Sequence, residues 1–334
     1  MKRFLQLMSF LLPVTLFIAG CGGTAESKKD NAQSDRQLTV YTTVYPLHYF
    51  TEVIGGNFVQ VKTIYPPGSD EHTFEPSQKD MMKLADSDLF IYVGLGLEGF
   101  VEKAKSTLKN EKVSLLASGE HIHLEEGGAT NKAEDHAKDE THAVNHADED
   151  AHANEDKHNH GDIDPHVWLD PVYSKELAES IKDALIEQMP ENEDQFVQNY
   201  DALVQKLDTL NNDFSEVISQ AKDPEILVSH AAYGYWESRY GLKQISISGL
   251  STSTEPSQKK LESIVSTAKE HNTNYIFFEQ NVSSKLTEIV QGEIGAEPLY
   301  LHNLSVLTSE DIEKDRDYFS IMDDNLQALK KALY

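Results

Sequence analysis

Residues 196–217 read FVQNYDALVQKLDTLNNDFSEV, and large apolar side chains recur in this stretch at intervals of four and three. The stripe consists of Phe196, Tyr200, Leu203, Leu207, Leu210, Phe214 and Val217. This spacing covers one face of an α-helix, so it predicts a helix over residues 191–222. Such a helix would be about 45 Å long at 1.5 Å per residue, long enough to run past two lobes. A coiled-coil dimer seam would look similar, but the aromatic residues favour packing against a globular core.

Short apolar strands alternate with helices on both sides of this stretch. Strands are predicted at 38–45, 58–65, 89–93 and 113–116 before it, and at 226–229, 242–247, 275–278 and 298–301 after it. Such alternation predicts βα units and parallel sheets. We therefore expect an α/β fold of two lobes, each a roughly four-stranded, mainly parallel sheet with flanking helices, joined by one long rigid helix. The N-terminal lobe should span residues 37–190 and the C-terminal lobe residues 223–334.

The charge and the cysteine count exclude several classes of protein. The chain of 334 residues has 29 Lys and Arg against 56 Asp and Glu, for a net charge of −27. A polyanion repels nucleic acid and attracts cations, so we expect no nucleic-acid partner. The single cysteine rules out an intrachain disulfide, a four-cysteine zinc site and an iron–sulfur cluster.

The beginning of the chain has the pattern of a secretion signal. Lys2 and Arg3 precede an apolar run over residues 4–19, and small residues stand just before Cys21. The pattern resembles a bacterial lipoprotein signal, which implies that residues 1–20 are removed and that Cys21 is lipidated. An ordinary signal peptide or an uncleaved membrane anchor is the alternative. Residues 21–36 lack apolar periodicity and are predicted to be a flexible tether, holding the protein at the extracytoplasmic face of the cell membrane.

A polar segment inside the first lobe, residues 120–161, holds most of the histidines. Eight of the chain's 14 lie there: His121, His123, His136, His142, His146, His152, His158 and His160. With so few apolar residues, the segment is predicted to be disordered. Its acidic residues would concentrate divalent cations, so we expect an auxiliary metal-collecting loop and not the principal site. A solvated acidic loop without a role is the alternative.

Three of the other histidines stand at strand ends or in turn-rich loops. His72 follows the strand at 58–65, His166 lies in a Pro-rich loop, and His230 ends the strand at 226–229. Glu279 directly follows the strand at 275–278. Ligands of open α/β sheets bind beyond the carboxyl ends of strands, so these groups could converge between the lobes. Imidazole suits zinc, copper, iron and nickel. Taken alone, each histidine is more commonly a capping or hydrogen-bonded core residue, and Glu279 a solvated carboxylate at a strand end.

The remaining three histidines give weaker signals. His48 and His271 lie in or beside predicted helices and are expected to be structural, whereas His302 is ambiguous. The sequence lacks common catalytic motifs. It has no His-Glu-x-x-His motif of zinc proteases, no Walker loop and no Gly-x-Ser-x-Gly nucleophile elbow.

Four blocks of sequence, together with the lipoprotein signal, resemble one family. They are PGSDEHTFEPS at 67–77, DPHVWLDP at 164–171, SHAAYGY at 229–235 and GLS at 249–251. They resemble the metal-binding lipoproteins of bacterial ABC importers, and the zinc-uptake solute-binding proteins among them. The resemblance covers essentially the whole mature chain. It implies two α/β lobes bridged by a long helix and places metal ligands on His72, His166 and His230.

The resemblance also bears on the choice of metal and on the fourth ligand. Manganese-selective relatives usually have a carboxylate where His230 stands, so His230 argues for Zn2+. The zinc branch commonly has an acidic, His-rich insertion like residues 120–161. Some Gram-positive zinc relatives complete the site with a Glu after a strand of the C-terminal lobe, which Glu279 resembles. Water or Glu71 is the alternative fourth ligand.

The function implied is capture of extracytoplasmic Zn2+ and its delivery to the permease of an ABC importer. We expect a monomer that is not an enzyme. A manganese-binding homologue, a secreted zinc hydrolase and a zinc-storing surface adhesin are the alternatives, since three histidines plus a water also form a catalytic zinc site.

Overall fold

The computed structural model describes residues 37–124, 163–252, 255–282 and 285–334. Residues 37–334 form one compact unit. The expected signal, Cys21 and the tether lie outside the described residues, as do six insertion histidines: His136, His142, His146, His152, His158 and His160. In the described part of the chain, no helix has the length and apolar character needed to cross a membrane.

The first sheet has four parallel strands in the order β2-β1-β3-β4. Its strands are β1 (Leu38–Thr42), β2 (Val59–Thr63), β3 (Leu89–Tyr92) and β4 (Ser114–Ala117). Its helices are α1 (Tyr45–Gly55), α2 (Gln78–Ala85) and α3 (Val101–Leu108), with 3-10 turns η1 (Gly56–Phe58) and η2 (Ser118–His121). All four residues of β3 are buried, as its unbroken apolar sequence predicts for a central strand.

The second sheet repeats this arrangement, with the parallel order β6-β5-β7-β8. Its strands are β5 (Glu225–His230), β6 (Lys243–Ser248), β7 (Tyr275–Glu279) and β8 (Glu297–Leu301). The helices around it are α6 (Gly234–Tyr240), α7 (Gln258–Glu270), α8 (Lys285–Ile294), α9 (Ser309–Glu313) and α10 (Tyr318–Leu333). The two parallel sheets confirm the predicted α/β fold class. The residue limits expected for the two lobes remain a prediction.

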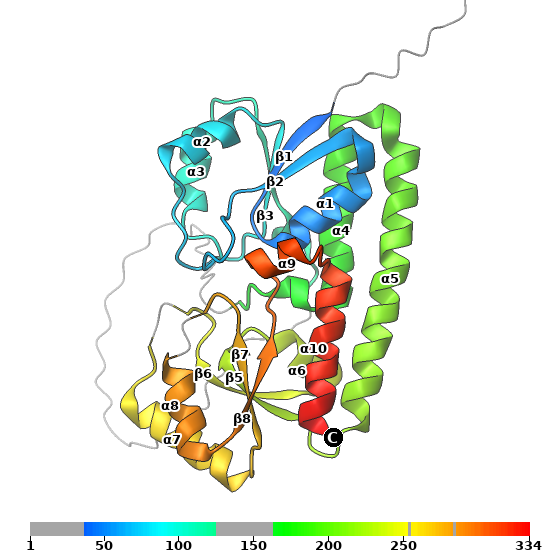
Figure 1. Ribbon diagram of the computed structural model, residues 1–334. Helices are drawn as coiled ribbons and strands as arrows, with labels where there is room; N and C mark the ends of the chain where they lie inside the picture. Colours follow the sequence, from blue (N-terminus) through cyan, green and yellow to red (C-terminus); the bar gives the residue numbers. More distant parts are fainter. Residues whose placement is uncertain (1–36, 125–162, 253–254, 283–284) are drawn as a thin grey trace, which may run out of the picture. The chain divides into compact units, whose positions relative to one another are not determined.

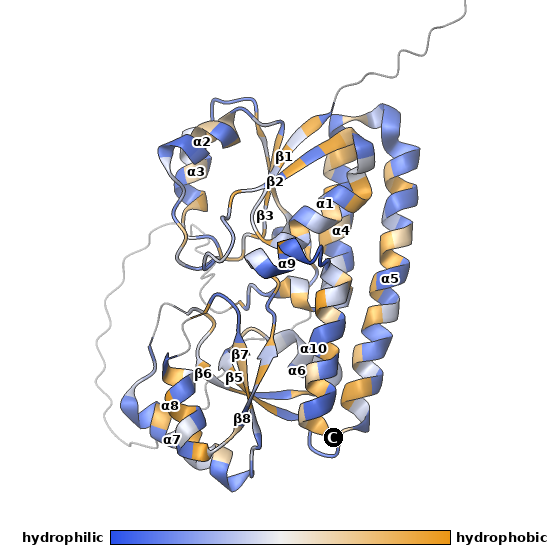
Figure 2. Cartoon of the chain, in the orientation of Figure 1, coloured by the Kyte–Doolittle hydropathy of each residue, from blue (hydrophilic) through white to orange (hydrophobic). Residues whose placement is uncertain are grey.

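Two long helices lie side by side, one beside the first sheet and the other running past both sheets (Figure 1). They are α4 (Pro171–Gln188) and the 28-residue α5 (Glu193–Gln220). Helix α5 contacts α1 and α4 as well as α6 and α10, so it packs against helices that flank both sheets. The predicted helix began too early, because Pro190–Asn192 form a separate 3-10 turn, η5. Figure 2 shows the hydrophobic residues of β1, β2 and α1 that form the core of the first sheet.

The predicted stripe on α5 is buried except at one position. Phe196, Leu203, Leu207 and Phe214 are at most 1% exposed, whereas Tyr200 is only partly buried. The Tyr200 ring lies beneath the ammonium group of Lys182, whose Nζ is 4.7 Å from the ring centroid. A cation over an aromatic face is a favourable contact at a half-exposed position. The stripe therefore packs against the globular core, as its aromatic residues predict.

The segment at 164–171 is held by contacts to residues of the C-terminal part of the chain. Trp168 and Trp236 are fully buried. Trp168 Nε1 donates to the carbonyl oxygen of Asn303 (2.6 Å), and Trp236 Nε1 donates to that of Leu169 (2.8 Å). These bonds fix a short 3-10 turn, η4 (Val167–Leu169), just before α4 begins.

Asp170 starts α4 and ties it to α6. Its side chain accepts hydrogen bonds from the backbone N–H groups of Val172 (2.7 Å) and Tyr173 (3.4 Å), and it forms an ion pair with Arg239. An Asp at this position satisfies N–H groups that no helical carbonyl can reach. Pro171 follows at the first helical position, where a missing N–H costs nothing.

We expect Asp170→Ala to lower the free energy of unfolding by about 2 kcal/mol, since both the helix cap and the Arg239 partner are lost. Asp170→Asn keeps a capping oxygen without the charge and should lose less. Urea unfolding followed by circular dichroism measures both variants. Equal midpoints for wild type and Asp170→Ala would show that this residue does not hold the start of α4.

Candidate metal centre

Three histidines from distant parts of the chain meet in one place. His72 lies in the loop after β2, His166 precedes η4, and His230 is the last residue of β5. One ring nitrogen from each lies within 4.8 Å of the others. Among the residues that the structure describes, no other group of three or more His, Cys, Asp or Glu side chains is packed so closely. His166 and His230 are fully buried, and the His72 side chain is 6% exposed.

A buried carboxylate orients His166. Asp164 Oδ1 lies 2.7 Å from His166 Nδ1 and also accepts from the His166 backbone N–H at 2.9 Å. A carboxylate at this distance holds the proton on Nδ1 and leaves Nε2 with a free electron pair. That Nε2 lies 3.4 Å from His72 Nε2, so the open nitrogen of His166 points into the group.

His230 has an acceptor beside each of its ring nitrogens. Nδ1 lies 3.2 Å from Glu279 Oε2, and Nε2 lies 3.1 Å from the carbonyl oxygen of Leu250. Ser229 Oγ donates to the other oxygen of Glu279 at 3.3 Å. Without a metal, this environment suits an imidazolium, which donates from both nitrogens.

The three imidazoles therefore differ in how strongly they bind a proton. Burial lowers the pKa of His72 to about 3 and that of His166 well below its usual range, and neighbouring imidazolium charge lowers both further. Burial also acts to lower the pKa of His230, but Glu279 and Glu71 outweigh it and raise that pKa to about 9. His72 and His166 are consequently neutral and ready to coordinate at pH 7, whereas His230 must release a proton.

Two further buried carboxyl groups surround the histidines. Burial raises the pKa of Glu71 to about 7 and that of Asp164 to about 7. Glu71 Oε1 lies 3.9 Å from His72 Nε2. Neither Glu71 nor Glu279 belongs to the close group of three, although both carboxylates lie at its edge.

Asn303 is a site residue that the sequence reasoning missed. Its Nδ2 donates to Glu71 Oε1 (3.2 Å) and to Glu279 Oε2 (3.1 Å), so one amide bridges the two carboxylates. Its Oδ1 accepts from the backbone N–H (3.0 Å) and the hydroxyl (2.8 Å) of Ser305, which fixes the orientation of the amide. The available signal was its position just after β8, the same strand-end context that singled out the histidines.

The other histidines lie outside this group. His302 is buried, but its Nε2 faces Asp311 Oδ2 at 3.2 Å and its Nδ1 accepts from the Leu304 N–H at 2.8 Å. His48 contacts Glu52 on α1, and His271 contacts Glu225 near the surface. His121 and His123 lie on the surface at and just after η2.

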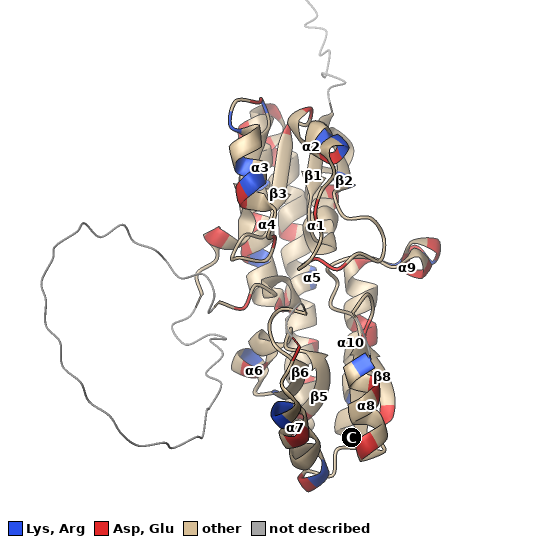
Figure 3. Cartoon of the chain, turned by 90° about the vertical axis from the view of Figure 1, so that its left-hand side faces the viewer, with Lys and Arg blue, Asp and Glu red and all other residues tan. Residues whose placement is uncertain are grey.

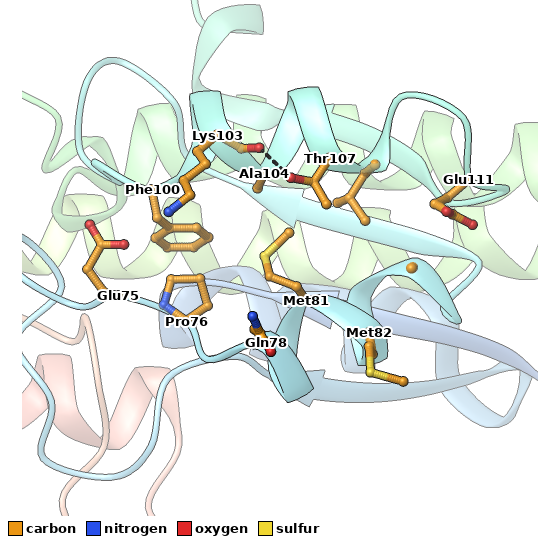
Figure 4. Close-up of a pocket in the computed structure, with 12 residues that line it drawn as sticks. Glu75, Pro76, Gln78, Met81, Met82, Phe100, Lys103, Ala104, Thr107 and Glu111 are labelled. Carbon is orange, nitrogen blue, oxygen red and sulfur yellow. Dashed lines mark hydrogen bonds between the residues drawn. The ribbon is translucent and has the colours of Figure 1, made fainter.

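One cavity lies apart from the histidines. It measures about 530 Å³ and lies between α2 and α3 (Figure 4). Pro76, Met81, Met82 and Phe100 make much of its lining apolar, and no histidine lines it. On the side of the molecule seen in Figure 3, acidic and basic residues are interspersed along α2, α3 and α7.

Comparison with known proteins agrees with the geometry. The model of the family described as "Zinc-uptake complex component A periplasmic" matches residues 40–332. Over 318 residues, the chain is 33% identical to the high-affinity zinc uptake system protein ZnuA of Bacillus subtilis, covering 95% of this chain and 94% of that protein.

A longer relative and its solved structure extend the comparison. The chain is 34% identical over 333 residues to the zinc-binding lipoprotein AdcA of Streptococcus pneumoniae; the match covers 99% of this chain but only 61% of that protein. The crystal structure of the Zn(II)-bound ZnuA-like domain of that AdcA superposes with a TM-score of 0.70 at 32% identity, covering 89% of this chain and 99% of that one.

We expect the metal-free protein to lose stability as the pH rises from about 6.5 to 9. The folded-state pKa values of Glu71, Asp164 and His230 are all raised, so these groups bind protons more tightly when folded. The stability that they contribute is present at low pH and is lost as the pH rises through about 7 and then about 9. Each released proton changes the free energy of unfolding by up to about 1.4 kcal/mol per pH unit.

Thermal unfolding in the presence of a chelator at several pH values measures this loss. His72 and His166 have lowered pKa values and act in the opposite direction, but only below about 6.5. Glu71→Gln removes a negative charge that helps to raise the pKa of His230, so it should give a shallower decline. Stability that is constant or increases between pH 6.5 and 9 would contradict these protonation states.

Proposed function

The chain belongs to the family of zinc-uptake complex component A, and from that premise we propose that it captures Zn2+ outside the cytoplasm and delivers it to an ABC-type permease. Proteins of this family are solute-binding components that work with the permeases of ABC transporters. His72, His166 and His230 would bind the ion. The observation that carries the proposal is the buried group of three imidazoles whose nitrogens lie within 4.8 Å.

The donor set favours zinc over manganese. Zinc is commonly held by three or four nitrogen, sulfur or oxygen donors in tetrahedral geometry, whereas carboxylate and carbonyl oxygens suit manganese. Three imidazoles converge here, and the carboxylates of Asp164 and Glu279 lie against the Nδ1 atoms of two of them. This carboxylate–imidazole pairing is the usual outer support of a zinc ligand.

The electrostatics of the group also suit a dication. Three buried carboxyl groups, Glu71, Asp164 and Glu279, surround the histidines, and Asn303 is a neutral partner for two of them. Burying negative charge without a compensating cation is costly. A bound Zn2+ would replace the proton on His230 and compensate the carboxylates, so binding should be tight and accompanied by proton release.

The remaining features of the proposal concern anchoring, assembly and chemistry. We propose that the protein acts as a monomer, attached by a lipid on Cys21 to the extracytoplasmic face of the membrane. It would make or break no bond in its cargo, because uptake requires only binding and release. The insertion histidines, six of them outside the described residues, would collect zinc but not form the transport site.

Alanine replacements at the three histidines test the principal site. We expect His72→Ala, His166→Ala and His230→Ala each to lower zinc affinity at least about 100-fold, since each removes a ligand that a water replaces poorly. Titration with Zn2+ against a competing chelator measures the affinity of the purified full-length variants. His271→Ala is the matched control: His271 contacts Glu225 near the surface, and zinc affinity should be unchanged. Wild-type affinity in all three variants would place the tight site elsewhere.

Glutamine replacements decide the fourth position. Glu279 can leave His230 to bind the metal, or it can stay on His230 Nδ1 and orient the ring toward the ion. If Glu279 is a ligand, Glu279→Gln should lower zinc affinity by more than about 100-fold, while Glu71→Gln changes it only a few-fold. The reverse order would assign the position to Glu71. If both variants lose about 10-fold or less in zinc affinity, the fourth ligand is a water molecule.

A further inference from the structure

One tyrosine hydroxyl is buried near the metal centre without a hydrogen-bond partner. Tyr233 stands directly before α6 and is fully buried. Its hydroxyl makes no hydrogen bond to any residue that the structure describes. Tyr235 and Tyr318 are buried to a similar extent, but their hydroxyls donate to the carbonyl oxygens of Asp164 (2.5 Å) and Trp168 (3.0 Å). An unpartnered buried hydroxyl is uncommon in folded proteins, so the one on Tyr233 calls for an explanation.

The backbone and the ring of Tyr233 are both held in place. The backbone N–H donates to Gln244 Oε1 (3.3 Å), and the carbonyl oxygen accepts from the N–H of Trp236 (3.0 Å). The ring packs against the Trp236 ring with 4.7 Å between their centroids, and the Trp236 indole is itself bonded to Leu169. The hydroxyl therefore has a defined position in the core. Because a buried donor without an acceptor costs free energy, an acceptor brought to this position would be stabilised.

Two carboxylates of the metal centre act on this hydroxyl. Burial, and after it the negative charges of Glu279 and Glu71, raise the pKa of Tyr233 well above its usual range. The phenol therefore keeps its proton and acts toward a carboxylate as a hydrogen-bond donor. Glu279 has the larger effect of the two, and it is also the carboxylate that lies against His230 Nδ1.

Metal binding would change the partners of Glu279. Without metal, one carboxylate oxygen accepts from Asn303 Nδ2 (3.1 Å) and lies 3.2 Å from His230 Nδ1, and the other accepts from Ser229 Oγ (3.3 Å). Capture of Zn2+ would remove the proton from His230 and offer the carboxylate a different cation. A carboxylate that turns toward the ion with one oxygen needs a donor that holds the other oxygen.

We propose that Tyr233 is a positioning residue of the zinc site: when the ion is bound, its hydroxyl donates a hydrogen bond to Glu279 and holds that carboxylate in place as the fourth ligand. This role rests on the proposed function and deepens it. In the metal-free protein the donor is unsatisfied, so the hydrogen bond that it gains on loading adds to the free energy of metal binding.

The variant Y233F tests this role in the full-length chain, because it keeps the ring and removes the hydroxyl. Zinc affinity, titrated against a competing chelator, should fall about 10-fold or more. The urea midpoint of the metal-free protein, measured with chelator present, should be unchanged or higher, since the hydroxyl makes no hydrogen bond there to the described residues. A loss of affinity below about threefold, or a lowered midpoint, would overturn the proposal.

The variant Y318F is the matched control. It also removes a fully buried tyrosine hydroxyl, but one that donates to the carbonyl oxygen of Trp168 without metal. Its urea midpoint should fall, and its zinc affinity should change by less than about threefold. Equal losses of zinc affinity in Y233F and Y318F would show that loosening of the core weakens binding, and would overturn the proposal.

A double-mutant cycle tests whether Tyr233 acts through Glu279. The variant E279A removes the expected acceptor, so adding Y233F to it should change zinc affinity by less than about threefold. A further loss of about 10-fold would show that the hydroxyl acts on another group, and would refute the proposal.

The variant H166A distinguishes failure of this proposal from failure of the proposed function. If H166A lowers zinc affinity at least about 100-fold and Y233F leaves it unchanged, the role of Tyr233 is refuted and the principal site stands. If H166A binds zinc as the wild type does, the tight site lies elsewhere, and the principal site and the role of Tyr233 are both wrong.

Discussion

The capping of α4 by Asp170 is the interaction on which the rest of the structure depends. This carboxylate accepts from the N–H groups of Val172 and Tyr173 and pairs with Arg239 of α6. It thereby fixes the end of the 164–171 segment, in which His166 is buried and Asp164 holds its ring. Trp168 joins the same segment to the loop that carries Asn303. One short stretch therefore starts a long helix, joins residues far apart in sequence and directs His166 Nε2 toward His72.

The centre assembled around that segment is a balance of buried charges. Glu71, Asp164 and Glu279 are all nearly inaccessible to solvent. Without metal, burial raises the pKa values of Glu71 and Asp164, and Glu279 faces His230 and the Asn303 amide. Burial of a carboxylate favours its protonated form, whereas a nearby cation favours its ionised form. A zinc ion bound by the three imidazoles, as proposed here, would supply that cation. Metal binding at this site would therefore be coupled to proton release.

Much of the fold could be predicted from the sequence because it depends on local patterns. The βα alternation predicted eight strands in parallel sheets, and the stripe from Phe196 to Val217 predicted α5, although the turn at Pro190–Asn192 delays its start. The convergence of His72, His166 and His230 followed from their strand-end contexts and the family resemblance. The role of Asn303 could not be predicted in this way. Its bond to Glu71 joins residues 232 positions apart, and no local pattern shows that a neutral amide bridges two carboxylates.

The most direct test of the central claim is X-ray absorption spectroscopy at the zinc edge, on protein loaded with one equivalent of Zn2+ at pH 7.5. Coordination by His72, His166 and His230 predicts a four-coordinate ion at about 2.0–2.1 Å, with the outer-shell scattering of three imidazole rings. His166→Ala loaded in the same way should lose one ring from that pattern. A spectrum dominated by oxygen ligands, with one imidazole ring or none, would contradict the account.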